Sequence, residues 1–258
     1  MHVVDTGSGT PLVLLHAYPV DSRMWDPMRG PLSEGARLIM PDQRGMGRSP
    51  LPAQPTEPSL DVAADDVIAL LDDLGLDRVV LGGCSMGGYT AMAILRKAPQ
   101  RVSGVVLMNT RPDADDAERR ANRLAAAERA EREGIDWLAD TMLPVLLAAG
   151  TPTVRPDLVA WLRSIIIAQS PSGIAWAQRA MAARPDSTEV LRAFTGPALV
   201  AVGERDVLTT PKLAAEMANL LPSGELIELA GCGHLSPVEA PEELAAAIVD
   251  WLARSSLR

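Results

Sequence analysis

Short, largely apolar runs alternate with an amphipathic stretch in the first part of the chain. The runs at 12–15, 37–40, 79–82 and 102–108 contain mostly aliphatic side chains, and a strand covered on both faces need not alternate apolar with polar positions. Residues 60–74 place their apolar side chains on one helical face and most of their aspartates on the other. Strands that alternate with helices in this way predict a mostly parallel, doubly wound sheet with crossover helices.

The N-terminal residues predict a pair of strands. Residues 3–5 precede a turn at 7–9, and the run 12–15 follows that turn. We expect these two runs to pair with each other. The second should be central in the sheet because it is continuously apolar.

The pattern changes after residue 110. Between residues 111 and 191 no convincing strand is predicted, and helical stretches are expected roughly at 113–133, 135–147, 156–168 and 172–183. The first of these is so rich in charged side chains that we expect it to be a solvated face. Trp137 and Trp161 lie in this region, where packing among the helices is the simpler interpretation and lining of a substrate pocket is the alternative.

The earlier pattern then returns. Strand-like runs at 198–203 and 226–229 precede a closing helix at 242–253, and Ser236-Pro237-Val238-Glu239 just before that helix fits the S-x-x-E capping box. We therefore expect an α/β core made of residues 1–110 and 192–258. Residues 111–191 would form an all-helical cap over the carboxyl end of its sheet.

Composition and charge limit the possible partners. The chain has 258 residues, 47% of them hydrophobic, which suffices for one α/β core with an insertion. Its formal net charge of −9 argues against nucleic acid and anionic membranes as partners, and no apolar stretch approaches the roughly 20 residues that span a bilayer. Two cysteines cannot make a disulfide framework, and no signal-peptide pattern is visible, so we expect a cytoplasmic protein.

One glycine-rich segment carries a candidate nucleophile. Gly-Cys-Ser-Met-Gly at 83–87 joins a predicted strand to a predicted helix and fits the G-x-S-x-G pattern, in which the serine occupies a strained strand-to-helix turn. The register of the glycines does not fit a dinucleotide fingerprint, and the segment lacks the lysine of a phosphate loop. Ser85 is therefore the candidate nucleophile, and the N–H of Met86, the next residue, is a candidate oxyanion donor.

A serine hydroxyl needs a base to take its proton and a carboxylate to orient that base. The chain has three histidines. His234 follows a strand end and is the best base by elimination, whereas His16 better fits a histidine bonded to loop carbonyls. Asp206 follows the strand at 198–203 and is the favoured acid, with Glu204 as the nearest competitor. The order serine, aspartate, histidine is that of G-x-S-x-G hydrolases, and this chemistry needs no metal and no organic cofactor.

These segments together resemble the α/β-hydrolase-fold family over essentially the whole chain. The resemblance is carried by His16-Ala17-Tyr18-Pro19 (similar to H-G-x-P), the loop at 42–49 (similar to D-x-R-G-x-G-x-S), the serine segment, Gly203-Glu204-Arg205-Asp206 and Gly233-His234. It implies that the N–H of Tyr18 is the second oxyanion donor and that Arg44 is structural. Ala17 departs from the usual glycine. The cap passage from Gln169 to Asp186 is loosely similar to the 3-oxoadipate enol-lactonase branch.

The sequence thus predicts a serine hydrolase of small carboxylic esters or lactones. Perhydrolysis, acyl transfer or lyase chemistry on the same fold remains the first alternative, and a ligand-binding member without turnover the second. The expected partner is a small-molecule substrate. The sequence does not predict the substrate's identity or the oligomeric state.

Overall fold

A computed structural model describes residues 1–54, 56–255 and 257. Among these residues the strands form one seven-stranded sheet in the order β1-β3-β2-β4-β5-β6-β7. Every neighbouring pair is parallel except β1 and β3. The strands are β1 (Val3–Gly7), β2 (Thr10–Leu15), β3 (Ala36–Pro41), β4 (Val79–Cys84), β5 (Val102–Met108), β6 (Ala198–Gly203) and β7 (Gly224–Leu229). The predicted parallel sheet is confirmed.

The predicted pairing of the first two strands is wrong. β1 pairs with β3, in antiparallel register from Val3 opposite Pro41 to Gly7 opposite Arg37. β2 lies between β3 and β4 and is parallel to both, so neither of its edges is free for β1. An ion pair between Arg37 and Asp5, with 2.6 Å between Nη2 and Oδ2, joins β1 to β3. The central position of β2 is as expected.

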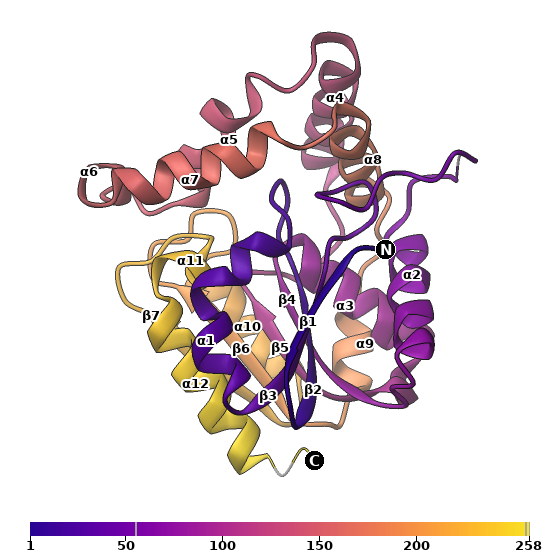
Figure 1. The fold of residues 1–258 in the computed structure, drawn as a ribbon, viewed down its shortest axis with the longest axis vertical. Coiled ribbons are helices and arrows are strands. Elements are labelled where there is room, and N and C mark those ends of the chain that lie inside the picture. Colours follow the sequence, from indigo (N-terminus) through magenta and orange to yellow (C-terminus); the bar gives the residue numbers. More distant parts are fainter. Residues whose placement is uncertain (55, 256, 258) are drawn as a thin grey trace.

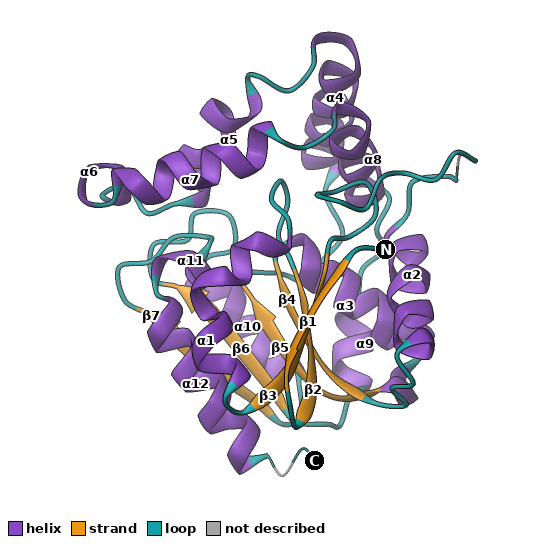
Figure 2. Cartoon of the chain, in the orientation of Figure 1, coloured by secondary structure: helices purple, strands orange, loops and turns teal. Residues whose placement is uncertain are grey.

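Helices cover both faces of the sheet (Figures 1 and 2). On one face α1 (Asp26–Ser33) packs on α12 (Pro241–Arg254), and the short α11 (Ser236–Glu239) contacts both. The other face carries α2 (Leu60–Asp73), α3 (Met86–Lys97), α9 (Thr188–Ala193) and α10 (Pro211–Leu220). Two 3-10 turns complete the core, η1 (Ser22–Trp25) and η2 (Pro99–Arg101). This is the layer arrangement of a doubly wound α/β protein.

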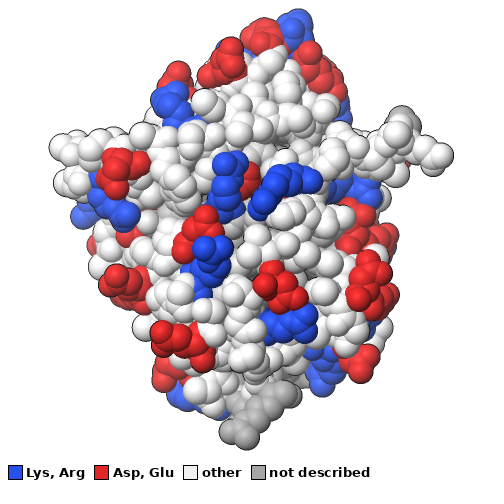
Figure 3. Space-filling model, viewed as in Figure 1, with Lys and Arg blue, Asp and Glu red and all other residues white. Residues whose placement is uncertain are grey.

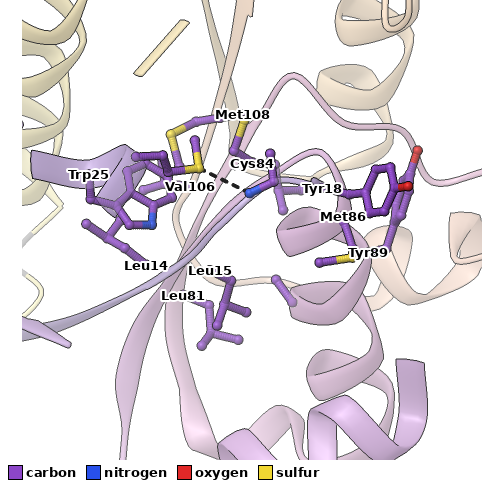
Figure 4. Packing of buried hydrophobic residues seen from close by; sticks show 14 of the residues in the cluster. Leu14, Leu15, Tyr18, Trp25, Leu81, Cys84, Met86, Tyr89, Val106 and Met108 are labelled. Atoms are coloured by element: carbon purple, nitrogen blue, oxygen red, sulfur yellow. Dashed lines mark hydrogen bonds between the residues drawn. The ribbon is translucent and has the colours of Figure 1, made fainter. Parts of the chain in front are cut away.

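The buried hydrophobic cluster extends from the sheet to the carboxyl ends of its strands. Leu14, Leu81 and Val106 extend from β2, β4 and β5, and Tyr18 and Tyr89 lie where these strands end (Figure 4). The backbone N–H of Ala17 donates to the Sδ of Met24 at 3.1 Å. The loop after β2 is therefore anchored to the core by its backbone.

Between β5 and β6 the described residues form helices and no strand. We keep the name cap for residues 111–191. Four helices in this range match the predicted ones and α6 is additional, whereas α9 begins inside the range, ends at Ala193 and belongs to the core layer. Figure 1 shows α4 to α8 above the carboxyl ends of the strands, whereas α9 packs lower down against α3 and α10. The helices not yet given are α4 (Ala117–Glu133), α5 (Leu138–Leu146), α6 (Thr151–Val154), α7 (Pro156–Ile167) and α8 (Pro171–Ala182).

No single helix within the described residues is long and apolar enough to cross a membrane. The pair α7 and α8 would reach that length and composition only together, and the two helices meet at 93°. Charged side chains of both signs are interspersed over the face drawn in Figure 3.

Candidate active site

Ser85 occupies a sharp turn between β4 and α3. Its φ is 52° and its ψ −112°, a region that residues other than glycine rarely adopt. Backbone crowding requires the glycines on either side. A Cβ on Gly87 would lie 1.9 Å from the carbonyl oxygen of Leu15, and one on Gly83 would lie 2.4 Å from the carbonyl carbon of Gly87. The strand-turn-helix geometry predicted for this segment is confirmed.

Asp206 and His234 meet at the ends of β6 and β7. The Nδ1 of His234 lies 2.8 Å from the Oδ2 of Asp206, and both residues are buried. The other oxygen, Oδ1, accepts hydrogen bonds from the backbone N–H groups of Leu208 and Thr209 at 2.8 and 2.9 Å. Burial raises the pKa of Asp206, but His234, Asn109 and Thr209 outweigh it and lower the pKa to about 2. The carboxylate therefore stays ionised beside the imidazole.

Glu204, the competing acid, lies elsewhere. Its Oε2 accepts from the backbone N–H of Gly231 at 2.7 Å, and the residue is exposed. Among the described residues Glu204 forms an ion pair only with the neighbouring Arg205, with 3.9 Å between Nε and Oε2. The contact with His234 is thus made by Asp206.

Asn109 is a functional candidate that the sequence did not predict, because its side chain carries no charge. It follows β5, has a φ of 47°, and donates from Nδ2 to the Oδ2 of Asp206 at 2.9 Å. The same amide donates to the carbonyl of Gly233 at 3.2 Å, and its Oδ1 accepts from the Oγ of Ser236 at 2.5 Å. Asn109 therefore positions both the acid and the loop of His234. Its place at a strand end next to β6 was the available signal.

The capping box predicted at 236–239 is wrong. Ser236 donates to Asn109 and does not cap α11. The carboxylate of Glu239 accepts from the backbone N–H of Gly233 at 2.7 Å, from that of Ala148 at 3.0 Å and from the hydroxyl of Thr151 at 2.5 Å. Glu239 therefore joins the loop of His234 to the cap. Ala148 and Thr151 lie far from Glu239 in the sequence, as Asn109 does from Ser236, so a local motif could not predict these contacts.

The loop after β2 is fixed by His16. Its Nε2 accepts from the backbone N–H of Gln43 at 2.9 Å, and its Nδ1 lies 2.9 Å from the carbonyl of Ala17. Burial lowers the pKa of His16, so the ring stays neutral and can accept that bond. His16 is bonded to one loop carbonyl, as predicted, and also to one loop N–H group. It holds the segment that carries Tyr18, while Met86 is the first residue of α3, where backbone N–H groups have no partner within the helix.

A pocket of about 250 Å³ lies between the core and the cap. Ser85, His234 and Tyr18 all line it, together with side chains from α4, α5 and α8. A larger hollow of about 600 Å³ lies beside α3 and α9, but neither Ser85 nor His234 lines it. Of these two, only the smaller pocket is lined by the candidate serine and the candidate histidine.

Trp137 and Trp161 are not among the described residues that line this pocket. The indole N–H of Trp137 donates to the carbonyl of Gly134 at 2.8 Å, and the guanidinium of Arg129 lies 4.1 Å from its ring. Trp161 is half-buried against the hydrophobic cluster. The packing interpretation of both tryptophans is the one the structure supports.

The charged helix α4 also differs from expectation. Instead of a wholly solvated face, it turns Arg119, Asn122 and Arg123 toward the pocket. Helical spacing of three to four residues places these three on one side of α4. The sequence did not predict this because paired charges can face either solvent or a polar cavity.

Two further residues have supporting contacts. Arg44 forms a two-bond ion pair with Asp66 of α2, at 2.6 and 2.5 Å, as the structural role implied by the resemblance requires. Cys84 is buried, and burial raises the pKa of its thiol, so it is not a thiolate nucleophile.

Within the described residues no group of three or more His, Cys, Asp or Glu side chains could hold a metal ion.

The family model for the alpha/beta hydrolase fold matches residues 10–241. The chain therefore belongs to the α/β-hydrolase-fold family, and its relatives show it to be a hydrolase. It is similar to a thermophilic esterase from Thermogutta terrifontis solved with malate bound (39% identity, 98% of this chain and 93% of that one, TM-score 0.95). It is also similar to the enol-lactonase from Burkholderia xenovorans LB400 (29% identity, 98% and 96%, TM-score 0.89). A third relative is the putative non-heme bromoperoxidase BpoC of Mycobacterium tuberculosis (28% identity, 96% of each chain).

Proposed function

We propose that this hydrolase cleaves a small carboxylic ester or lactone with Ser85 as nucleophile, His234 as base and Asp206 as the orienting acid. One observation carries the proposal. His234 is held by Asp206 at 2.8 Å and lines the same pocket as Ser85, which stands on a strained turn. The esterase and the enol-lactonase among the relatives support this substrate class.

The reaction starts with proton transfer from the Oγ of Ser85 to the Nε2 of His234 as Oγ attacks the substrate carbonyl. Asp206 stays ionised, fixes the ring with its proton on Nδ1, and stabilises the imidazolium. The backbone N–H groups of Tyr18 and Met86 are proposed to bind the oxyanion. The imidazolium then protonates the leaving alkoxide, which leaves an acyl-enzyme.

Water completes the cycle. His234 removes a proton from a water molecule, whose oxygen attacks the acyl carbon, and the second tetrahedral intermediate collapses to the acid and free Ser85. Each proton that His234 accepts is returned within the same half-reaction. The pocket of about 250 Å³ is smaller than usual sites for drug-sized ligands and favours a small substrate.

Covalent labelling tests this proposal. A fluorophosphonate probe should modify Ser85, identified by peptide mass mapping, in protein that also hydrolyses p-nitrophenyl acetate. The Ser85→Ala protein should take up no probe, and Ser172→Ala, at an exposed serine at the start of α8, should label fully. Labelling elsewhere with full esterase activity in Ser85→Ala would overturn the assignment.

A second candidate is perhydrolysis, which the bromoperoxidase name of one relative favours. Hydrogen peroxide would replace water in the second half-reaction and release a peracid. Bromide oxidation that requires both peroxide and a carboxylic acid, and that is lost in Ser85→Ala, would establish perhydrolysis.

We also propose that the protein is cytoplasmic. Its two cysteines are buried and unpaired, which suits a reducing compartment.

A further inference from the structure

The cap side of the pocket is rich in arginine. Arg111, Arg119 and Arg123 line it, and Asp115 is the one carboxylate among the described lining residues. The chain as a whole has a formal net charge of −9. The charged residues that line the pocket are therefore net positive, whereas the chain as a whole is net negative.

Asp115 is already neutralised by arginines. Its Oδ2 lies 2.5 Å from the Nε of Arg123 and 2.9 Å from the Nη1 of Arg184. Burial raises the pKa of this carboxyl, but the two guanidinium groups lower it by more, so it remains ionised. Because two positive charges face one negative charge, this group keeps a net positive charge beside the pocket.

Two of the lining arginines have N–H groups without a strong acceptor. The Nη1 of Arg123 has only the amide oxygen of Gln178 and the thioether sulfur of Met181, each at 3.3 Å, and a thioether is a weak acceptor. Arg119 forms an ion pair through its Nε with the Oδ2 of Asp116 at 2.9 Å, but its Nη1 is buried without a hydrogen-bond partner in the described part of the chain and lies 3.6 Å from the Oδ2 of Asp113.

The groups around the N–H donors of Arg119 and Arg123 indicate which kind of ligand could accept hydrogen bonds from them. The phenol of Tyr18, on the loop after β2, also lines the pocket, and burial raises its pKa well above the ordinary value, so it is a neutral hydroxyl that can donate. Arg111 is engaged with Asp113 through two bonds. The Oδ1 of Asp115 is also buried without a partner among the described residues, so a ligand hydroxyl could bind there as well. A planar, doubly accepting anion is the group that guanidinium donors bind best.

We propose that this pocket selects substrates that carry a second, free carboxylate, bound by Arg119 and Arg123 of α4. The substrate class would be half-esters and lactones of small dicarboxylic or hydroxy-dicarboxylic acids. This inference rests on the proposed esterase function, because Ser85 and the arginines line one pocket of about 250 Å³ and must act on the same small molecule.

Matched substrate pairs test the inference. Monomethyl glutarate and its neutral isostere methyl 4-carbamoylbutanoate place the charge on the acyl side, and 3-acetoxypropanoate and 3-acetoxypropanamide place it on the alcohol side. We expect kcat/KM to favour the anion of at least one pair by roughly 10- to 100-fold, the range of a charge-assisted, two-bond contact. Equal or slower hydrolysis of both anions would overturn the proposal.

Variants assign the effect to α4. Arg119→Gln and Arg123→Gln should each reduce the anion preference, the ratio of kcat/KM for the anion to that for its neutral partner, by about 10-fold. Arg120→Gln is the matched control, because Arg120 is an exposed arginine of the same helix that does not line the pocket. Arg123→Lys keeps the charge near Asp115 and should retain part of the preference if Arg123→Gln folds poorly.

A binding measurement separates failure of this inference from failure of the proposed function. Calorimetry on Ser85→Ala should show glutarate binding at least about 10-fold more tightly than glutaramide, and the difference should weaken in Arg119→Gln. Hydrolysis of neutral esters with no preference for glutarate would refute the carboxylate site alone. Tight glutarate binding with no ester turnover by the native chain would refute the esterase function and leave the anion site standing.

Discussion

The two walls of the pocket are built in different ways. On the core wall, Ser85, Asp206 and His234 lie on loops that directly follow parallel strands, and Asn109, Thr209 and backbone N–H groups fill the acceptor positions of Asp206. On the cap wall, side chains project from helices, and the donors of Arg119 and Arg123 are incompletely used. A site with its polar groups satisfied is rigid, whereas one with free donors is prepared for a ligand. The comparison suggests that the core wall performs the chemistry and the cap wall chooses the substrate.

Ser85→Ala should give the largest effect and test the core wall directly. Because the three groups act as a unit, we expect kcat to fall by roughly 10⁴-fold or more, with a similar loss in His234→Ala. Steady-state hydrolysis of p-nitrophenyl acetate measures both. A loss below about tenfold in either variant would show that the chemistry resides elsewhere.

The pH dependence of stability should depend on Asp206. Its folded-state pKa of about 2 lies below that of an unfolded aspartate, so it contributes stability that is complete above the unfolded pKa and is lost as the pH falls through the folded one. Denaturant unfolding between about pH 5 and pH 2 should lose about 2 kcal/mol from this group. Asp206→Asn should reduce this loss of unfolding free energy at low pH. Asp136→Asn, at an exposed position, should leave the loss unchanged.

Glu239→Gln tests the connection between the two walls. The carboxylate accepts three hydrogen bonds, from Gly233, Ala148 and Thr151, and an amide would turn an N–H₂ group toward some of these donors. We expect a loss of roughly 1–3 kcal/mol in the free energy of unfolding and a smaller fall in kcat than for Ser85→Ala. Glu243→Gln, at an exposed residue of α12, is the control. Unchanged stability would mean that the cap is held by its other contacts.

Trp137→Phe should give the smallest effect and separates the packing of the cap from its pocket surface. The substitution removes the indole N–H bond to Gly134 and weakens the stacking with Arg129. We expect about 1 kcal/mol of destabilisation and kcat/KM within about twofold of the native value. A tenfold change in KM would place this residue in the substrate pocket after all.

Much of the core wall could be predicted because its signals are local. Apolar runs followed by glycine placed Ser85, and a scarcity of histidines isolated His234. The only signal for Asn109 was its place at a strand end, and it was missed because a neutral amide carries no charge and its role depends on Asp206, which is far away in the sequence. The prediction of a capping box at 236–239 was wrong for the same reason, since Glu239 accepts hydrogen bonds from donors outside its own helix.

The sequence by itself determined the strands, the crossover helices, the serine turn and the order of the three candidate groups, because hydrophobic periodicity and glycine requirements act over a few residues. Only the tertiary structure decided that β1 pairs with β3, that Asn109 joins Asp206 to the loop of His234, and that α4 turns arginines into the pocket. These outcomes depend on which distant elements become neighbours. Which elements become neighbours depends on the packing of the whole chain, and the residue spacing within a single segment does not predict it.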